Sequence, residues 1–433
     1  MLGDMPDTAT AAATTTTASE SLYPRHAIQR LRDAMADTPV VLIHGPRQCG
    51  KTTLAKMASK EHGHVYITFD DENALRSAKN DPVGFCAELP QRVILDEVQR
   101  VPELFVSLKK IIDENRAPGR FLLTGSANVL LLPKLSDSLA GRMEIVRLEP
   151  LAQVEIARAA PGSVTLLERL FSARLPAFRG KRLGDALVRR VLSGGFPAAL
   201  ARATQSRQRE WHKNYIETIT QRDVRELANI HSLKTVPRLL EAAATQTARL
   251  FNVAELAAPF ELSRPTVRDY MSLLEQLFLI EILQPWHHNR LNRLIKTPKL
   301  HLTDTGLAGA LLGVTTESLK ADRNPYGQLL ETFVFHELRR QATWSDARHN
   351  FYHYRDKDKL EVDIVIERAD GDLVGVEVKA SSTVATSDFR GLRRLQEASG
   401  KRFIRGVLFY DGDAALSMGD NMHALPYAAL WEQ

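Results

Sequence analysis

The residues best suited to chemistry lie at positions 45–53, where the sequence reads Gly-Pro-Arg-Gln-Cys-Gly-Lys-Thr-Thr. An apolar run at 40–43 precedes them and a helical pattern follows, which is the strand–loop–helix order of a phosphate-binding loop. Gly45 and Gly50 allow the backbone N–H groups to point at phosphate oxygens. Lys51 is expected to reach the β- and γ-phosphates, and Thr52 to ligate Mg²⁺. The alternative is a chance match of a short pattern.

The loop therefore predicts an ATP site that begins where a helix adds a favourable field for anions. A thiol inside the loop, Cys49, would make the site sensitive to oxidation or alkylation. The residues expected to contact the nucleotide are Gly45, Pro46, Arg47, Gln48, Cys49, Gly50, Lys51, Thr52 and Thr53.

An acidic pair follows the apolar run at residues 93–95. Asp96 would hold Mg²⁺, directly or through water, and Glu97 would orient and activate the attacking water. An exposed turn is the alternative for such a pair. The next strand, at 121–124, also ends in small polar residues, and Ser126 and Asn128 could sense the γ-phosphate from between the loop and the acidic strand. A polar turn accounts for each of these two equally well.

A second group of chemical residues lies near the C-terminus. Asp363 interrupts an apolar run, and Glu377 and Lys379 share one face of the next strand because strand side chains alternate. Glu331 lies on a predicted helix at 329–341 just before them. Carboxylates can hold Mg²⁺, which lowers the pKa of bound water, and Lys379 could position that water. An edge strand carrying a salt bridge is the alternative.

The elements that must position these residues follow from the hydrophobic pattern. Apolar runs at 40–43, 65–69, 93–95, 121–124 and 145–148 alternate with helical segments such as 51–60 and 104–115. Buried strands separated by helices predict a parallel sheet covered on both faces. Residues 151–248 are mostly helical in pattern. After residue 325 a helix, three strands, a second helix and a further strand are predicted, with a tight hairpin at Gly371.

The segment 251–303 predicts helix, turn, helix and two strands, the pattern of a winged helix-turn-helix. Ser263 is a good N-cap for the second helix, whose outward residues would include Arg264, Thr266 and Arg268. Such a helix can enter a DNA major groove or serve only protein contacts. The basic residues that could meet phosphates as the wing are Arg290, Arg293, Lys296 and Lys299.

Composition sets broad limits on the protein. The chain has 433 residues, a formal charge of +5 and a sequence pI of 9.1, which permits a polyanionic partner without requiring one. No apolar run approaches the ~18 residues of a membrane helix, and two cysteines without metal spacing are typical of a cytoplasmic protein. The predicted parts are a disordered tail at 1–22, an ATPase domain at 23–150, a helical region at 151–248, a winged helix-turn-helix at 249–320 and an α/β domain at 321–433.

Taken in order, these motifs resemble two known families. The loop at 45–53, Asp96-Glu97, the residues after 124 and Gly141-Arg142 resemble the Walker A, Walker B and sensor-1 elements and the final strand of AAA+ ATPases. In that family an arginine at this last position often reaches the γ-phosphate of a neighbouring subunit, so Arg142 implies a homo-oligomer, with a ring as one form. Its alternative role is to satisfy local carbonyl groups at a helix end.

The C-terminal carboxylates resemble the PD-(D/E)xK nuclease superfamily, with counterparts at Glu331, Asp363, Glu377 and Lys379 and a weaker one at Gln396. Residues 25–433 as a whole resemble ATPases that join an AAA domain to a DUF4143 region. This resemblance supplies no role for Arg222-Asp223 or Asp304, for which an ion pair or a cap is the simplest interpretation.

Three functions are compatible with these features. The first is a DNA-acting ATPase, in which ATP hydrolysis is coupled to DNA binding or remodelling, including branched DNA. The second is a nucleotide-dependent switch or scaffold whose nuclease-like domain is structural. The third is an ATP-fuelled, Mg²⁺-dependent nuclease.

Overall fold

A five-stranded parallel sheet forms the N-terminal part of the protein. The computed structural model describes residues 22–60, 62–126, 137–175, 177–224, 235–289, 293 and 297–432, so the predicted tail lies almost entirely outside the described residues. The strands follow the order β2-β3-β4-β1-β5 and all pairs are parallel, as predicted. Their bounds are β1 Val40–His44, β2 Val65–Thr68, β3 Val93–Asp96, β4 Phe121–Gly125 and β5 Met143–Arg147.

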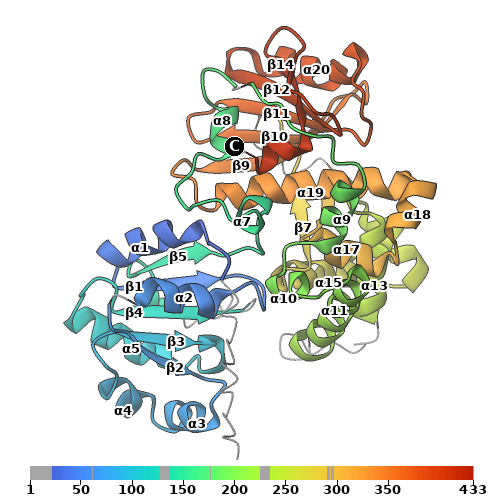
Figure 1. The fold of residues 1–433 in the computed structure, drawn as a ribbon. Coiled ribbons are helices and arrows are strands. Elements are labelled where there is room, and N and C mark those ends of the chain that lie inside the picture. Colours follow the sequence, from blue (N-terminus) through green and yellow to red (C-terminus); the bar gives the residue numbers. More distant parts are fainter. Residues whose placement is uncertain are drawn as a thin grey trace, which may run out of the picture.

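Helices cover both faces of this sheet, which is why its central strands are apolar on both sides (Figure 1). In β1, Val41 and Ile43 pack on one face with α1 and α2, while Val40 and Leu42 pack on the other. The helices are α1 Ala27–Asp37, α2 Lys51–Ser59, α3 Glu72–Asn80, α4 Pro82–Ala87, η1 Val98–Arg100 and α5 Leu104–Glu114.

The helical region that follows does not pack as a separate unit. Helix α8 lies against the C-terminal α/β part, where Arg405 donates to the carbonyl oxygens of Arg169 and Leu170 at 3.0 and 2.9 Å. Helices α9 and α11 instead pack against α17. The elements are α7 Gln153–Ile156, α8 Leu166–Leu170, α9 Asp185–Ser193, α10 Pro197–Leu200, α11 Gln205–Thr218, the π-helix η3 Ile219–Asp223, α13 Thr235–Thr245, α17 Thr305–Leu311 and α18 Thr316–Ala321.

The predicted helix, turn, helix and strands are present between them. Ser263 caps α15 by accepting from the Thr266 N–H at 3.2 Å, and Val267, Met271 and Leu274 form its buried face. A three-stranded antiparallel sheet in the order β6-β8-β7 lies beside the helices. The bounds are β6 Arg249–Leu250, α14 Val253–Ala257, η4 Ala258–Phe260, α15 Arg264–Gln276, β7 Ile280–Leu283 and β8 Lys299–Leu302.

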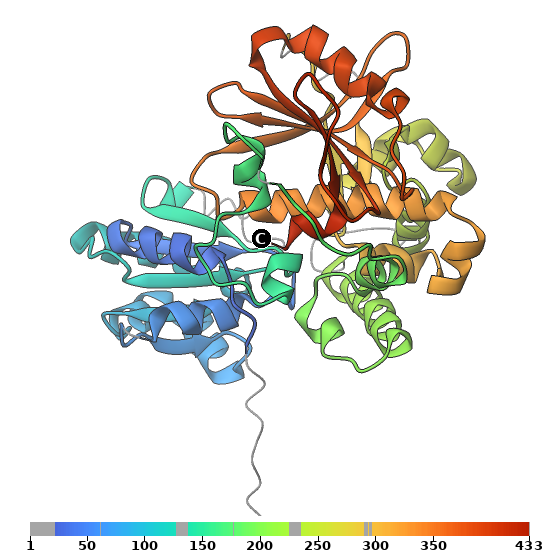
Figure 2. The same cartoon turned by 45° about the horizontal axis from the view of Figure 1, so that its top comes forward.

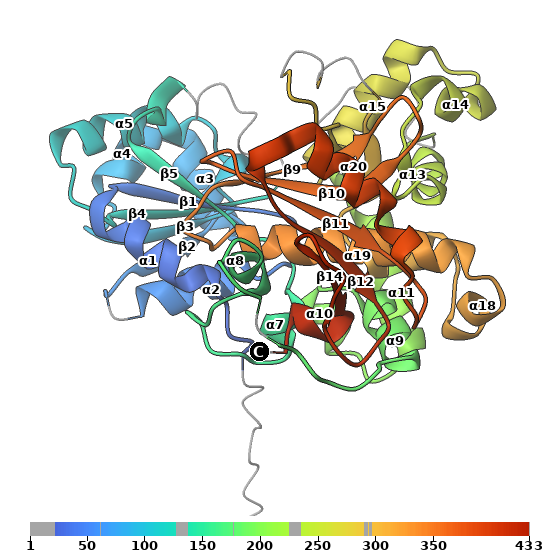
Figure 3. The same ribbon diagram turned by 90° about the horizontal axis from the view of Figure 1, so that it is seen from above.

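The C-terminal part is a mixed six-stranded sheet between two helices, in the order β13-β14-β12-β11-β10-β9. Helix α19 crosses one face and α20 lies on the other, as Figures 2 and 3 show. The predicted hairpin joins β10 to β11 through Gly371, which has a φ of 94°. The bounds are α19 Asn324–Ala342, β9 His349–Arg355, β10 Glu361–Arg368, β11 Leu373–Val378, η5 Thr386–Phe389, α20 Arg390–Ser399, η6 Gly400–Arg402, β12 Phe403–Tyr410, β13 Leu416–Ser417, β14 Met422–Pro426 and η7 Tyr427–Leu430.

A large hydrophobic core joins most of the elements after the N-terminal sheet, while α20 and the outer face of the C-terminal sheet form a separate, smaller core. The large core runs from Ala152 through α9, α11, α13, α15 and α17 to α19 and the adjacent face of the C-terminal sheet, ending at Trp431. The N-terminal sheet has two separate cores of its own. Among the described residues, no helix is long and apolar enough to cross a membrane.

A buried ion network lies where the parts meet. Arg340 on α19 donates to Asp304 at 3.1 Å, to Glu337 at 3.0 Å and to the Leu151 carbonyl oxygen at 3.0 Å. Asp304 also caps α17 and accepts from the Gly195 N–H at 2.8 Å, which confirms the cap and ion pair expected for it. Burial alone would lower the pKa of Arg340, but the two carboxylates raise it, so the guanidinium is charged.

Replacing Arg340 tests how much this buried ion network contributes to the free energy of unfolding. Arg340→Met leaves two carboxylates whose side chains have no exposed surface, so we expect a loss of about 3–5 kcal/mol and a clearly lower unfolding midpoint. Arg393→Met is the control, because its pair with Asp420 is exposed and worth at most about 1 kcal/mol. Thermal and urea unfolding of both variants measure the difference, and equal midpoints would contradict the role given to Arg340.

Candidate active site

The phosphate-binding loop connects β1 to α2. Gly50 has a φ of 103° and directly precedes the helix, a left-handed conformation that favours glycine. Gly45 packs so closely that a Cβ atom there would clash with the carbonyl oxygen of Leu148. Both predicted glycines are therefore required by the path of the loop.

Lys51 places its ammonium inside this loop. Its Nζ donates to the carbonyl oxygens of Gly45 and Pro46 at 3.0 and 2.9 Å, and the residue is buried. The positive charge and the first N–H groups of α2 thus lie at the same point, which can bind an anion such as a polyphosphate.

Arg25 holds the phosphate loop in place, and it was not predicted because no recognisable motif surrounds it. Its guanidinium donates to the carbonyl oxygens of Cys49 at 2.7 Å and Glu149 at 2.8 Å and to the Glu155 carboxylate at 3.0 Å. Five N–H donors in a rigid fork allow one arginine to hold three segments together. Arg25 therefore links the loop to the chain that leaves the sheet.

Asp96 lies at the end of β3, within reach of Thr52. The Thr52 hydroxyl lies 3.0 and 3.1 Å from the two carboxylate oxygens, so the two predicted Mg²⁺ ligands are brought together. Tyr66 on β2 donates to the same carboxylate at 2.7 Å, and Thr124 on β4 donates to it as well. Burial and the contact with Asp96 raise the pKa of Tyr66 to about 12, so it acts as a donor. Tyr66 and Thr124 were missed from sequence.

Glu97 follows in a left-handed conformation, with a φ of 58°. Its carboxylate accepts from the Gln99 side chain, which also donates to the Ser126 hydroxyl at 3.0 Å. Strand β4 lies between β1 and β3, so Ser126 lies between the loop and the acidic strand as expected. A strained backbone at such a position is typical of functional sites. Asn128 lies outside the described residues, and Gln99 was not predicted.

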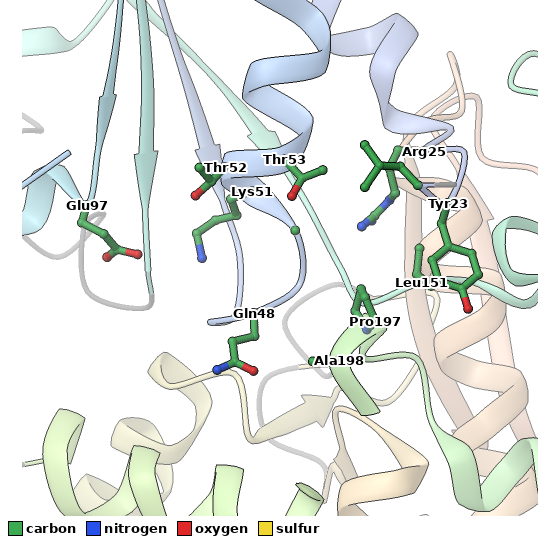
Figure 4. Close-up of a pocket in the computed structure, with 12 residues that line it drawn as sticks. Tyr23, Arg25, Gln48, Lys51, Thr52, Thr53, Glu97, Leu151, Pro197 and Ala198 are labelled. Carbon is green, nitrogen blue, oxygen red and sulfur yellow. The ribbon is translucent and has the colours of Figure 1, made fainter. Parts of the chain in front are cut away.

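A cavity of about 430 Å³ opens beside these groups (Figure 4). Its polar side carries Lys51, Thr52 and Glu97. Its less polar side is built by Tyr23 before α1 and by Leu151 and Pro197 from the region after the sheet. Gln48 and Thr53 also line it, together with Leu22, Arg25, Gly50 and Ala198. A charged end and an apolar end suit a nucleoside triphosphate.

Two loop residues make contacts that the sequence does not predict. The Cys49 thiol is buried, lies 3.4 Å from the Leu148 carbonyl oxygen and packs in the core beside α2. Burial raises its pKa, so a reactive thiolate is disfavoured and the expected sensitivity to thiol reagents is not supported. Arg47 uses its carbonyl oxygen to accept from Tyr215 on α11 at 3.3 Å, which links the loop to the helical region.

Arg142 lies at the opposite end of the strands from the phosphate loop. It precedes the amino end of β5, whereas the phosphate loop follows the carboxyl end of the neighbouring parallel strand β1. Its guanidinium forms two hydrogen bonds with Asp113, at 2.7 and 2.9 Å, and one with the Ala140 carbonyl oxygen at 3.2 Å. Within one chain it therefore has the local role and does not reach the chain's own loop.

The C-terminal carboxylates are brought together around a lysine side chain. Glu331, Asp363 and Glu377 meet around the ammonium of Lys299, which lies 2.7 Å from Glu331 and 3.2 Å from Asp363. In the part of the chain that the structure describes, no group of three or more His, Cys, Asp or Glu residues is placed to hold a metal ion. A lysine from β8 thus lies among the carboxylates at the place where the predicted metal ion would bind.

The other residues predicted for this site also lie elsewhere. Lys379 is partly exposed and lies 3.9 Å from Asp388 rather than in the cluster. Gln396 is partly exposed and donates to the Asp420 carbonyl oxygen at 3.2 Å.

The predicted phosphate contacts of the wing are likewise corrected where the structure describes them. Lys299 is buried in the carboxylate cluster, and Arg293 is buried in a two-bond ion pair with Glu367 at 2.7 and 3.2 Å. Neither side chain is available to a phosphate. Arg290 and Lys296 lie outside the described residues.

Comparisons with known proteins match three successive parts of the chain to family models. Family models described as an AAA domain, as domain of unknown function DUF8612 and as domain of unknown function DUF4143 match residues 37–157, 184–318 and 326–430. An uncharacterized protein of Mycobacterium tuberculosis, Rv2008c, is 31% identical over 404 residues, covering 93% of this chain and 83% of its own. Another, MJ1544 of Methanocaldococcus jannaschii, is 22% identical and covers 91% and 87%.

Among solved structures, the Walker-type ATPase PABY2304 of Pyrococcus abyssi covers 68% of this chain and 97% of its own, with 16% identity and a TM-score of 0.42. The parallel sheet, the phosphate loop and the two matched domain models in this order show that the chain belongs to the family of proteins that join a P-loop AAA+ ATPase domain to a DUF4143 region.

Proposed function

We propose that this protein binds ATP with Mg²⁺ at the loop of residues 45–53, hydrolyses it, and couples hydrolysis to DNA binding or remodelling. The observation that carries the ATPase part is the meeting of Lys51, Thr52, Asp96 and Glu97 at one edge of the sheet. These residue types fit MgATP, since an ammonium meets phosphate oxygens and a hydroxyl beside a carboxylate provides oxygen ligands for Mg²⁺.

Each residue has a distinct task in this proposal. Lys51 and the first turn of α2 bind the β- and γ-phosphates, and Thr52 and Asp96 hold Mg²⁺, which when bound neutralises charge on the phosphates. Glu97 orients the attacking water and accepts its proton. Gln99 keeps the Glu97 carboxylate beside Ser126, while Tyr66 and Thr124 keep Asp96 turned toward Thr52.

The apolar end of the cavity suits the base. Tyr23 and Leu151 offer apolar surface there, and Pro197 brings the first turn of α10 to the same wall. Gly195, two residues before Pro197, donates to Asp304, which pairs with Arg340 on α19. A nucleotide that contacts this wall is therefore connected, through these hydrogen bonds, to the part of the chain that carries the helix-turn-helix.

DNA is the partner that the exposed helix favours. Arg264 and Arg268 are exposed on α15, with the buried face of the helix turned away from them, as predicted. A capped helix with exposed arginines next to an antiparallel β-sheet can enter a groove and contact phosphates. The corrected positions of Arg293 and Lys299 leave α15 as the main described candidate for this contact.

Arg142 belongs to the proposal as a residue acting between subunits. It lies at the end of the strands opposite to its own phosphate loop. Only a neighbouring copy in a homo-oligomer could therefore present its guanidinium to a nucleotide. It would have to exchange Asp113 for the γ-phosphate. Such an arginine is worth about 10³-fold or more in rate.

Glu97→Gln tests the hydrolytic role. We expect turnover to fall by about 10²-fold or more because the amide cannot accept the proton, while nucleotide binding is retained. Steady-state ATPase assays and binding of a fluorescent ATP analogue measure the two properties separately. Turnover close to wild type in this variant would contradict the assignment of Glu97.

Mixing two defective proteins tests the shared site. Arg142→Ala and Glu97→Gln should each be nearly inactive alone, but mixed oligomers contain sites with both residues intact. In an equal mixture that exchanges subunits, about a quarter of wild-type turnover should return. No recovery, with exchange demonstrated by labelled subunits, would confine Arg142 to its pair with Asp113.

A DNA panel tests the coupling. Duplex, forked and four-way-junction DNA should raise the ATPase rate, and binding should weaken steeply with salt. Arg264→Glu with Arg268→Glu should reduce affinity by about tenfold or more and flatten the salt dependence. Arg393→Glu on α20 is the matched control. Absence of binding and stimulation at low salt would reject DNA coupling and favour a nucleotide-dependent switch.

A further inference from the structure

The carboxylates at the centre of the C-terminal part surround a side chain from another segment. Glu331 comes from α19, Asp363 from β10 and Glu377 from β11, whereas Lys299 begins β8 of the three-stranded sheet. The Lys299 side chain is only 3% exposed. Asp363 also accepts from the Val378 N–H at 3.0 Å, so one of its oxygens is held by backbone and the other by the ammonium.

The ammonium occupies the position that a divalent cation would need. Mg²⁺ binds oxygen at about 2.0–2.1 Å with near-octahedral geometry, which requires direct access to several carboxylate oxygens. The nearest oxygens of Glu331 and Asp363 already point at Lys299 Nζ. A metal ion beside this buried charge would also be repelled strongly, since screening by water is weak there.

The charges of the surrounding groups are consistent with a single internal cation. Burial alone would lower the pKa of Lys299, but Glu331 and Asp363 raise it above its usual range. Burial and the neighbouring Asp363 raise the pKa values of Glu331 and Glu377. On the neighbouring elements, burial lowers the pKa of His301 well below its usual value, and that of His353 to about 3. Both imidazoles are therefore neutral.

Contacts on both sides of the segment 284–299 show what the lysine holds in place. At its start, two backbone hydrogen bonds join the segment to His353 on the edge strand β9. The Trp286 N–H donates to the His353 carbonyl oxygen at 2.6 Å, and the His353 N–H donates to the Gln284 carbonyl oxygen at 3.0 Å. At its end, Lys299 enters the carboxylate cluster. Both ends of the segment that follows the helix-turn-helix are thus fastened to the C-terminal sheet.

We propose that Lys299 is a built-in cation that takes the place of a catalytic metal and fastens β8 to the C-terminal sheet. The nuclease-like part is then a rigid platform for the helix-turn-helix and not a metal-dependent nuclease. This inference depends neither on ATP hydrolysis nor on DNA binding.

Metal binding provides the first test, in full-length protein carrying Asp96→Asn to remove the ATPase ligand. The parent should bind no Mn²⁺ up to roughly 1 mM, the upper range for modest carboxylate sites, as followed by the paramagnetic resonance signal of free Mn²⁺. Lys299→Ala should gain one Mn²⁺ site, and adding Asp363→Asn should abolish it. Mn²⁺ bound by the parent and lost with Asp363→Asn would overturn the proposal.

Stability provides the second test and applies even if the alanine variant does not fold. Lys299→Met keeps the length of the side chain without its charge and should lower the unfolding midpoint by roughly 5 °C. Lys379→Met, on the partly exposed lysine outside the cluster, should lower it by less than about 2 °C. A midpoint for Lys299→Met equal to that of the control would overturn the fastening role.

Discussion

The buried guanidinium of Arg340 is the interaction on which the arrangement of the parts depends. A charge removed from water is stable only if acids and carbonyl groups surround it in good geometry. Here the acids come from α19 itself and from the cap of α17, and the carbonyl oxygen comes from Leu151, just after the ATPase sheet. Three segments far apart in sequence must therefore meet at one point.

Lys299 repeats this principle near the middle of α19, where it pairs with Glu331. Glu331 lies on the same helix as Glu337 and Arg340, so α19 carries members of both buried ion clusters. Apolar packing along α19 is non-directional and would tolerate sliding, whereas ion clusters at two points fix its register against β8 and α17. The shared core supplies the stabilising area, and the charged clusters specify its alignment.

Local patterns predicted much of the structure. The five parallel strands, the phosphate loop, the Asp96-Glu97 pair and the helix-turn-helix elements were found because each depends on short-range periodicity or spacing. Arg25, Tyr66 and Gln99 were missed because their roles arise only when distant segments meet. Lys299 and Arg293 were wrongly assigned to an exposed basic wing. A basic run in the sequence does not show which of its side chains form buried ion pairs with distant carboxylates.

The position of the cavity follows from the division of the chain into the N-terminal sheet and the residues after 151. The N-terminal sheet has two cores of its own, and the residues after 151 form separate cores, so polar and aromatic contacts connect the two parts, among them Tyr215 with the Arg47 carbonyl oxygen and Arg340 with the Leu151 carbonyl oxygen. The cavity lies at this junction and has walls from both bodies. A ligand that contacts Lys51 on one side and Pro197 on the other gains affinity when the bodies approach, and by linkage their approach favours the ligand. The polar network from Gly195 to Arg340 connects the second wall to the part of the chain that holds α15.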